Sequence, residues 1–192
     1  NLHATATTGN MTQSGALDIE GTTTLITSAD DATITLGTTS NAFTGALLIT
    51  TNDSGTDTAG DVSIHGGATA LVLGNSTIDG DLTLTSTAAG TAAITDTGRL
   101  NIRGITTVSA SGVNVTLNTT TNNFQGAVKI GGVNVTVVDA GAIDLGASTV
   151  TGTYAVTATA GGDITDSGVL AITGTSAFTV AGGRNITLDQ SS

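Results

Sequence analysis

Histidine is the residue type most often used as a base near neutral pH, and this sequence contains two, His3 and His65. A catalytic or metal-binding histidine needs partners at a defined spacing, as in the H-E-x-x-H motif. Neither histidine has such partners, and their sequence neighbours have nothing in common. We therefore interpret both as structural or simply exposed residues.

Carboxylates are the more promising group, because fifteen acidic residues stand against four basic ones. The closest groupings are Asp30-Asp31, Asp79-Gly80-Asp81, and Asp163 with Asp166. Enzymes that cleave acidic polysaccharides can use such aspartates together with Arg or Lys. Here only Asp96 lies close to an arginine, Arg99, and four basic residues scarcely form a cationic groove. The sequence therefore predicts no catalytic residue and no enzyme.

The same carboxylates could also bind calcium, since hard cations take oxygen ligands. The calcium-binding repeat G-G-x-G-x-D is absent, and Gly161-Gly-Asp-Ile-Thr-Asp166 is only a weak echo of it. The best place for an adventitious ion is the polar stretch that holds Asp53, Asp57 and Asp61. We interpret these aspartates as solvated turn residues, so the sequence predicts no metal-binding residue and no cofactor.

The formal net charge of −11 restricts the partners of the chain. Nucleic acid is not expected, because neutralising phosphates needs clustered Lys and Arg. The apolar runs are far shorter than the roughly 20 residues that cross a bilayer, so no membrane insertion is expected either. The absence of Cys excludes disulfides and thiolate metal sites.

The elements that must position these side chains read as short β-strands. Charged residues are only 10% of the chain and Pro is absent, whereas Val, Ile and Thr are abundant. Apolar residues alternate with polar ones in runs such as Asp81-Leu-Thr-Leu-Thr85 and Asn134-Val-Thr-Val137. No segment keeps a period of 3.6 residues for three turns, so helix is not expected.

One sequence unit occurs three times and begins at Met11, Ile94 and Ile164. The shared phrase is I-T-D-[ST]-G-x-L-x-I-x-G, with Met and Gln replacing Ile and Asp in the first copy. The units are residues 11–93, 94–163 and a truncated 164–192. Asp79 and Asp81 correspond to Thr151 and Thr153, and this variation argues against a catalytic role for the two aspartates.

The first unit contains an insertion of ten residues. Asn41 to Ile49 matches Asn122 to Ile130 at an offset of 81, whereas Val62 to Ile64 matches Val133 to Val135 at an offset of 71. The extra residues, 52–61, are polar and punctuated by Gly. We predict a loop that projects from the fold.

The tandem repeat favours a β-solenoid over a sandwich or a barrel. A sandwich has no reason to reproduce one pattern of about 70 residues in tandem, whereas a solenoid stacks coils of roughly 20 residues. The 192 residues then form nine or ten coils of a single parallel β-helix. We expect the three phenylalanines, Phe43, Phe124 and Phe178, to pack into or against its core.

Neither end of the sequence resembles a capping repeat. We therefore expect a slice of a longer array, whose open faces pair with flanking repeats of the same protein or with another copy of the segment.

Three repeated phrases resemble those of filamentous haemagglutinin-like large repetitive exoproteins: I-T-D-[ST]-G-x-L-x-I-x-G, N-x-F-x-G-A-[LV]-x-I, and L-G-x-S-T-[VI]-x-G. The resemblance covers essentially the whole chain. It implies a right-handed parallel β-helix, export by a dedicated partner transporter, and a place on the bacterial surface or outside the cell. It also implies a role in adhesion to glycans or proteins of a host or of neighbouring cells.

The predicted function is thus a non-catalytic stalk or spacer of a secreted bacterial adhesin or filament. An ice-binding solenoid is the main alternative, because Thr33-Ile-Thr35 and Thr83-Leu-Thr85 have its T-x-T form. These motifs do not recur once per coil, and thermal hysteresis would distinguish this function. A β-helix enzyme that cleaves polysaccharides is less favoured and would show activity on acidic glycans.

Overall fold

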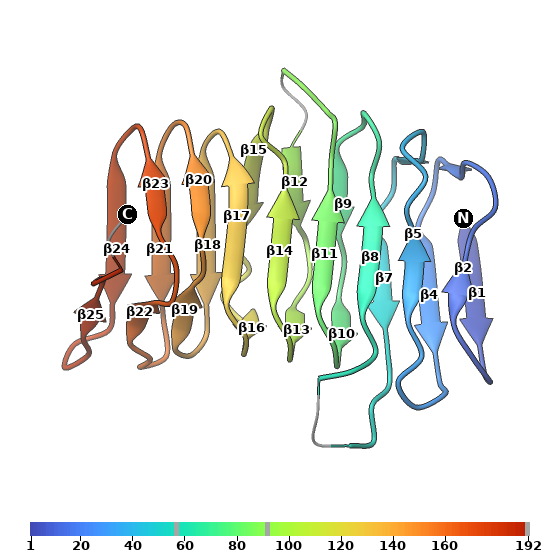
Figure 1. The fold of residues 1–192 in the computed structure, drawn as a ribbon, viewed down its shortest axis with the longest axis horizontal. Helices are drawn as coiled ribbons and strands as arrows, with labels where there is room; N and C mark the ends of the chain where they lie inside the picture. The colour runs from blue at the N-terminus through green and yellow to red at the C-terminus, as the bar shows by residue number, and fades with distance from the viewer. Residues whose placement is uncertain (56–57, 91–92, 191–192) are drawn as a thin grey trace.

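The computed structural model describes residues 1–55, 58–90 and 93–190. These residues form 25 strands and no helix, wound into a parallel β-solenoid of about 8 turns (Figure 1). The predicted parallel β-helix is therefore confirmed. Nine or ten coils were expected, and this number was too high. Leu82 lies beside Thr106, and Thr106 beside Val128, so these two coils take 24 and 22 residues rather than about 20.

Three strands make one coil. In the described residues every pairing is parallel and joins a strand to the third strand after it, except for the pairs β7–β9 and β17–β19. The strands therefore fall into three series, which we call ladders 1, 2 and 3.

Ladder 1 contains every strand whose number is one more than a multiple of three: β1 (Leu2–Ala6), β4 (Thr23–Thr27), β7 (Leu47–Thr50), β10 (Ser76–Ile78), β13 (Leu100–Ile102), β16 (Asn123–Phe124), β19 (Ile143–Leu145), β22 (Ile164–Asp166) and β25 (Ile186–Thr187). Ladder 2 contains the strands that follow these: β2 (Met11–Thr12), β5 (Ile34–Leu36), β8 (Val62–His65), β11 (Leu82–Thr85), β14 (Thr106–Ser109), β17 (Val128–Gly132), β20 (Ser148–Val150) and β23 (Leu170–Ile172). Ladder 3 completes each coil: β3 (Asp18–Ile19), β6 (Ala42–Phe43), β9 (Leu71–Leu73), β12 (Ala93–Asp96), β15 (Asn114–Leu117), β18 (Val135–Asp139), β21 (Tyr154–Ala158) and β24 (Ser176–Val180).

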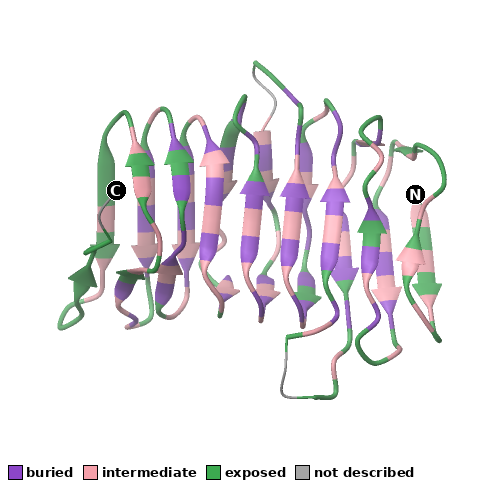
Figure 2. Ribbon diagram, viewed as in Figure 1, coloured by how far each residue is buried: buried purple, intermediate pink, exposed green. Residues whose placement is uncertain are grey.

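The core runs along the axis of the stack. In β11, Leu82 and Leu84 point inward and are buried, while the threonines between and after them are half-buried on the outside. Figure 2 shows the same alternation in the central coils, with more exposed residues towards both ends. Phe43 and Phe124 are buried, and Phe178 is partly buried against the core, which confirms the prediction for all three.

The repeated sequence unit does not contain a whole number of coils. Equivalent copies of the first repeated phrase begin in β2, β12 and β22, so one unit contains ten strands, or three coils and one further strand. The three copies consequently lie on ladders 2, 3 and 1. Each unit is therefore displaced around the axis by one ladder relative to the unit before it.

A buried asparagine joins the first two repeated phrases across neighbouring coils. Asn122 is fully buried; its Oδ1 accepts a hydrogen bond from the Leu100 N–H at 2.8 Å, and its Nδ2 donates to Asp96 at 2.7 Å. The equivalent Asn41 accepts from the Leu17 N–H and exchanges hydrogen bonds with Gln13. The asparagine of each N-x-F phrase thus accepts a hydrogen bond from the leucine N–H of the G-x-L phrase in the preceding coil.

The phenylalanine and glycine of the same phrase complete this contact. Phe124 pairs with Ile102 in the coil below. A Cβ atom on Gly126 would lie only 2.4 Å from the carbonyl oxygen of Gly104, so the two corners stack more closely than any side chain would permit.

Asp139 bridges the break in ladder 1 between β16 and β19. Its carboxylate accepts hydrogen bonds from the Phe124 N–H at 2.7 Å and the Gly141 N–H at 2.5 Å, and the residue is fully buried. The carboxylate therefore takes the place of a neighbouring strand. Burial raises the pKa of Asp139 above its ordinary value, although both hydrogen bonds oppose the shift.

The predicted insertion connects β7 to β8 and projects from the stack (Figure 1). Its base is anchored, because Thr51 is buried and its Oγ1 accepts a hydrogen bond from the Asp79 N–H at 3.0 Å.

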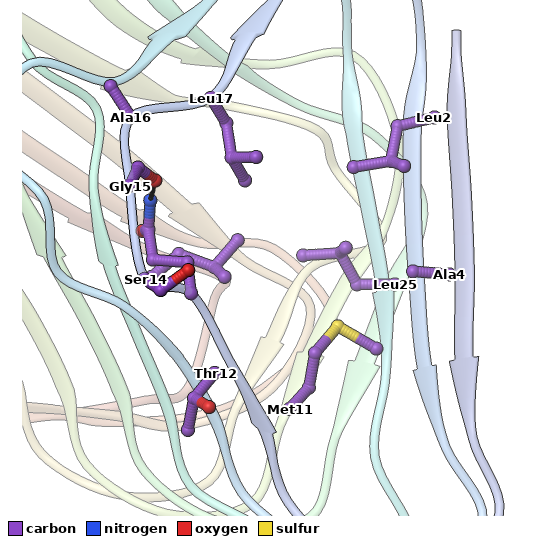
Figure 3. Close-up of a pocket in the computed structure, with 11 residues that line it drawn as sticks. Leu2, Ala4, Met11, Thr12, Ser14, Gly15, Ala16, Leu17 and Leu25 are labelled. Carbon is purple, nitrogen blue, oxygen red and sulfur yellow. Dashed lines mark hydrogen bonds between the residues drawn. The ribbon is translucent and has the colours of Figure 1, made fainter.

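The first coil encloses less of its apolar surface than the coils above it. A hollow of about 480 Å³ opens beside this coil, with Leu2, Met11, Leu17 and Leu25 around it (Figure 3).

Replacing Asn122 by Ala should lower the free energy of unfolding by about 2–4 kcal/mol, because the Leu100 N–H and one Asp96 oxygen lose a buried partner. Asn123→Ala is the matched control and should cost under about 1 kcal/mol, since this side chain is half-buried and, among the described residues, donates a hydrogen bond to Asn101 alone. Denaturant unfolding measures both variants. Equal losses of stability in the two variants would contradict the proposal that the buried hydrogen bonds of Asn122 hold the two coils together.

Asp139 should make the protein relatively more stable as the pH falls. Because its pKa is raised in the folded state, the native protein binds this proton more tightly than the unfolded chain. Its contribution to the free energy of unfolding therefore rises as the pH drops through the native pKa, and levels off below the unfolded value. Unfolding of the wild type and of Asp139→Asn, compared from pH 7 to 4, should show a difference that shifts in favour of the wild type at acid pH. A difference that stays constant would refute the pKa shift.

Candidate functional site

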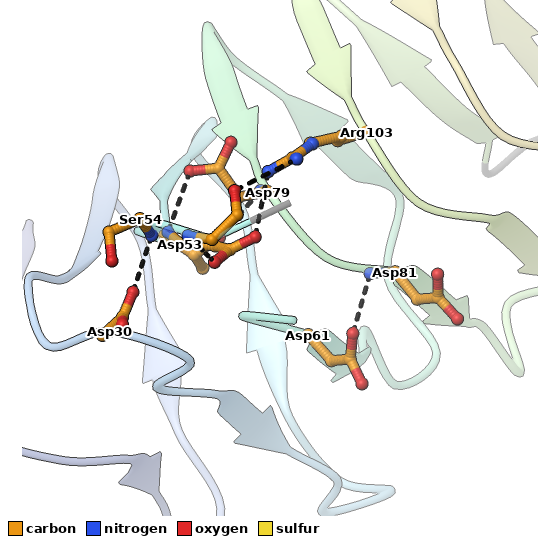
Figure 4. A network of polar contacts seen from close by, with 9 residues as sticks. Asp30, Asp53, Ser54, Asp61, Asp79, Asp81 and Arg103 are labelled. Atoms are coloured by element: carbon orange, nitrogen blue, oxygen red, sulfur yellow. Dashed lines mark hydrogen bonds and ion pairs between the residues drawn. The ribbon is translucent and has the colours of Figure 1, made fainter. Parts of the chain in front are cut away.

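Three aspartates come together beside the insertion. Asp30 and Asp31 lie between β4 and β5, Asp53 lies in the insertion, and each offers a carboxylate oxygen within 4.8 Å of the other two. Asp30 accepts a hydrogen bond from the Ser54 N–H at 2.6 Å, which joins the two segments (Figure 4). Asp31 adopts a left-handed backbone conformation with a φ of 59°. The turn at Asp30 and Asp31 thus places both carboxylates beside the insertion.

Arg103 balances the charge of this group from two coils away. Its Nη1 lies 2.9 Å from Asp53 Oδ2, and the Asp53 side chain is only 1% exposed. Arg103 Nη2 also donates to the Gly55 carbonyl at 3.3 Å, and the Asp53 N–H donates to Asp79 at 3.2 Å. The insertion projects from the stack, but its first residues are held against the later coils by an ion pair and backbone contacts.

The chemistry open to this group is limited by these contacts. Hydrogen bonds from Ser54 lower the pKa of Asp30, because they stabilise its ionised carboxylate. Three carboxylates suit a hard cation such as calcium, which takes six to eight oxygen ligands. Asp53, however, already bonds to Arg103 and to the Gly55 N–H. The contacts of Asp30 and Asp53 therefore serve first to hold the insertion against the neighbouring coils.

The sequence placed an adventitious ion at Asp53, Asp57 and Asp61. The structure brings Asp53 to Asp30 and Asp31 instead, and Asp57 lies outside the described residues. Asp61 faces another contact, because its Oδ1 accepts the Asp81 N–H at 2.8 Å.

The remaining candidate aspartates bind backbone N–H groups of the next coil. Asp81 accepts from Ile105 at 2.7 Å, and Asp163 accepts from Asn185 at 2.9 Å. Asp96 and its sequence equivalent Asp166 each accept two such N–H groups, from Asn118 and Thr119 and from Asp189 and Gln190. The spacing that suggested carboxylate chemistry therefore produces hydrogen bonds between coils.

The two histidines lie in different coils. His3 is exposed on β1, and its Nε2 is 3.4 Å from Thr5 Oγ1. His65 ends β8, and its Nδ1 accepts the Gly67 N–H at 3.0 Å. These strands belong to ladders 1 and 2 of separate coils, so the histidines share no site.

A second, more polar hollow of about 550 Å³ lies at the break in ladder 1, beside Arg99, Thr121 and Asn123. Arg99 donates to the Thr121 carbonyl at 3.1 Å and to Asn101 at 3.3 Å. Asp96, which precedes the same turn, accepts a hydrogen bond from Asn122 instead. The sequence neighbours Asp96 and Arg99 therefore form no ion pair in the described residues.

The sequence did not reveal two kinds of buried polar residue that join the coils, namely the asparagines of the N-x-F phrase and Asp139. Asn41 and Asn122 were visible as the first residue of the repeated N-x-F phrase, but nothing in the pattern indicated that they are buried. Asp139 has no counterpart that would have drawn attention to it. Among the described residues, no helix is long and apolar enough to cross a membrane.

Replacing Arg103 by Ala should lower the free energy of unfolding by about 2 kcal/mol, because the Asp53 carboxylate then stays buried without its partner. The double variant Arg103→Ala, Asp53→Ala should recover part of this loss. Arg99→Ala is the control and should cost under about 1 kcal/mol, since its contacts are exposed. Denaturant unfolding gives the coupling energy of the pair, and additive losses would show that the two side chains act independently.

One protein family matches almost the whole chain. Its description is "Repeats of unknown function (DUF5649)", and the matched residues are 1–50, 59–131 and 132–192. No curated protein and no solved structure matches the chain. The unmatched residues between the first two matches, 51–58, overlap the insertion. The second match runs from just before β8 to the penultimate residue of β17, which is one unit of ten strands. The chain therefore belongs to the DUF5649 family of repeats.

Proposed function

We propose that this segment is a non-catalytic stalk or spacer of a secreted bacterial surface adhesin or extracellular filament. The observation that carries the proposal is the ten-strand unit, which places equivalent residues on a different ladder in each copy. A binding or catalytic site repeated in this way would face a different direction each time. A rod loses nothing by the rotation, because only its length and stiffness matter.

The use of the acidic residues supports the same proposal. Aspartates from the three sequence groupings either bind backbone N–H groups of the adjacent coil, as Asp81 and Asp163 do, or hold the insertion in place, as Asp30 does. Their ionised oxygens are strong acceptors for buried or half-buried N–H groups, which strengthens the joints between coils. About 8 turns at a spacing of ~4.8 Å make the segment roughly 40 Å long.

The sequence resemblance supports the proposed place of the segment in a larger protein. The resemblance to filamentous haemagglutinin-like exoproteins implies a long stalk that acts in adhesion. In this proposal the segment is exported, stands on the cell surface or in a filament, and touches chiefly the flanking repeats.

An ice-binding function has one observation in its favour. Ladder 2 presents an outward row of hydroxyl groups on successive strands: Thr12, Thr35, Ser63, Thr83 and Thr107. The next residue in this row is Lys129, and the parallel outward row two residues further along each strand contains His65, Thr85, Ser109 and Gly131. A flat array two threonines wide is not formed, so the spacer function is favoured.

Exchanging residues 94–163 for another ten-strand unit of the same protein should leave adhesion unchanged within about twofold. Keeping ten strands preserves both the length of the rod and the direction that the following repeats face. Adhesion of whole cells is the measurement, and surface display of the protein, followed with an antibody, is the control. Loss of binding by a protein that still reaches the surface would show that the segment contains a receptor site.

A further inference from the structure

The strands of the first coil have sequence equivalents that are fully enclosed. β1, β2 and β3 correspond to β11, β12 and β13, and again to β21, β22 and β23. Leu2 and Met11 are only half-buried, whereas the residues at their positions in the later units are at most 1% exposed: Leu82 and Tyr154 for Leu2, and Ile94 and Ile164 for Met11.

The difference in burial arises because the later coils have a neighbouring coil on both sides, whereas the first coil has one on a single side in the described residues. β11 pairs with β8 below it and with β14 above it, and β21 pairs likewise with β18 and β24. In the described residues β1 pairs only with β4 and β2 only with β5. The outer edges of β1 and β2 therefore have backbone N–H and C=O groups free to pair with a further strand.

Apolar side chains line the same open side. Leu2, Met11, Leu17 and Leu25 surround the hollow of about 480 Å³ (Figure 3). In the second and third units the corresponding surface is covered by the coil β8–β10 or β18–β20. The inward residues of these two coils are almost completely buried: Val62, Ile64, Leu71, Leu73 and Ile78 in one, and Val135, Val137, Ile143, Leu145 and Val150 in the other.

The covering coils also share polar groups that fix their register. Both contain the phrase L-G-x-S-T-[VI]-x-G, and both begin with an acceptor for the coil above: Asp61 binds the Asp81 N–H, and Asn134 binds the Thr153 N–H at 3.0 Å. Asn1 occupies the position equivalent to Asp81 and Thr153.

We propose that the open side of the first coil is a docking surface for one coil of this same repeat, in the phase of residues 133–152. Phase here means the position of a strand within the ten-strand unit. This coil ends in Gly152, so joining it to Asn1 and Leu2 reproduces the natural junction Gly152-Thr153-Tyr154. Its inward Val, Ile and Leu side chains fill the hollow, and Asn134 accepts the N–H of Asn1.

A second copy of the chain fits this surface less well. The last coil, β23–β25, corresponds to β3–β5, and the coil that lies above β3–β5 is β6–β8 rather than the equivalent of β1–β3. Stacking two copies end to end would therefore place strands five positions out of phase. The exposed backbone would still pair, but the corner acceptors and inward side chains would not correspond.

Met11 is the single methionine of the chain and lines the docking surface, so its oxidation by peroxide reports whether the surface is covered. The test joins residues 133–152 to the N-terminus of the full chain. The matched control joins residues 153–174 instead, which also form three strands and end in Gly, but in the wrong phase. Sulfoxide formation at Met11 is followed by mass spectrometry, and thermal unfolding by circular dichroism.

The in-phase graft should slow oxidation of Met11 at least about tenfold and raise the unfolding midpoint by at least about 5 °C. The control graft should do neither to the same degree. Equal protection by both grafts would overturn the phase requirement, and no protection by either would overturn the docking surface itself. If Met11 of the ungrafted chain became protected as its concentration rose, a second copy would be the occupant and the proposed coil would be wrong. Loss of adhesion after the unit exchange would leave this docking surface standing, so the two proposals fail separately.

Discussion

Every coil of this solenoid can bury its apolar side chains only against the coils on either side of it. Three short strands enclose too little volume for a core of their own, so Leu82 or Val128 is buried by its counterparts one coil away. Parallel pairing of each strand with the third strand after it brings these counterparts into line. The stack is therefore stable as a continuous object, and its coils are not independent units.

The same stacking decides where polar groups can be buried. A corner between two strands leaves backbone N–H groups without a strand partner, and these must find acceptors elsewhere. Asn122, Asp81 and Asp139 supply such acceptors from a neighbouring coil, at distances between 2.7 and 2.8 Å. The aspartates that give the chain its negative charge are thus partly structural, because an ionised oxygen binds an N–H more strongly than a neutral one.

The mismatch between a ten-strand unit and a three-strand coil shapes the surface of the molecule. Strand residues that pair across one coil step are between 18 and 28 positions apart, and the 22 positions between Asn122 and Leu100 fall within this range. Inward residues must therefore recur at a spacing that matches the coil, whichever ladder they lie on. Outward residues face no such requirement. Asn101, for example, is replaced by Asp18 in the first copy and by Ala171 in the third. The inward pattern therefore repeats faithfully while the outer surface varies.

The sequence by itself determined the all-β solenoid, the repeat, the insertion and the burial of Phe43 and Phe124, because alternation and spacing are local properties of the chain. It did not determine the number of coils, since the length of each corner depends on which strands pair. Nor could it bring Asp53 to Asp30 and Arg103, or bury Asn122 against Asp96, because these contacts join residues from 23 to 50 positions apart. Only the tertiary structure sets the register of the coils, and that register decides whether a carboxylate faces a cation, a backbone N–H or solvent.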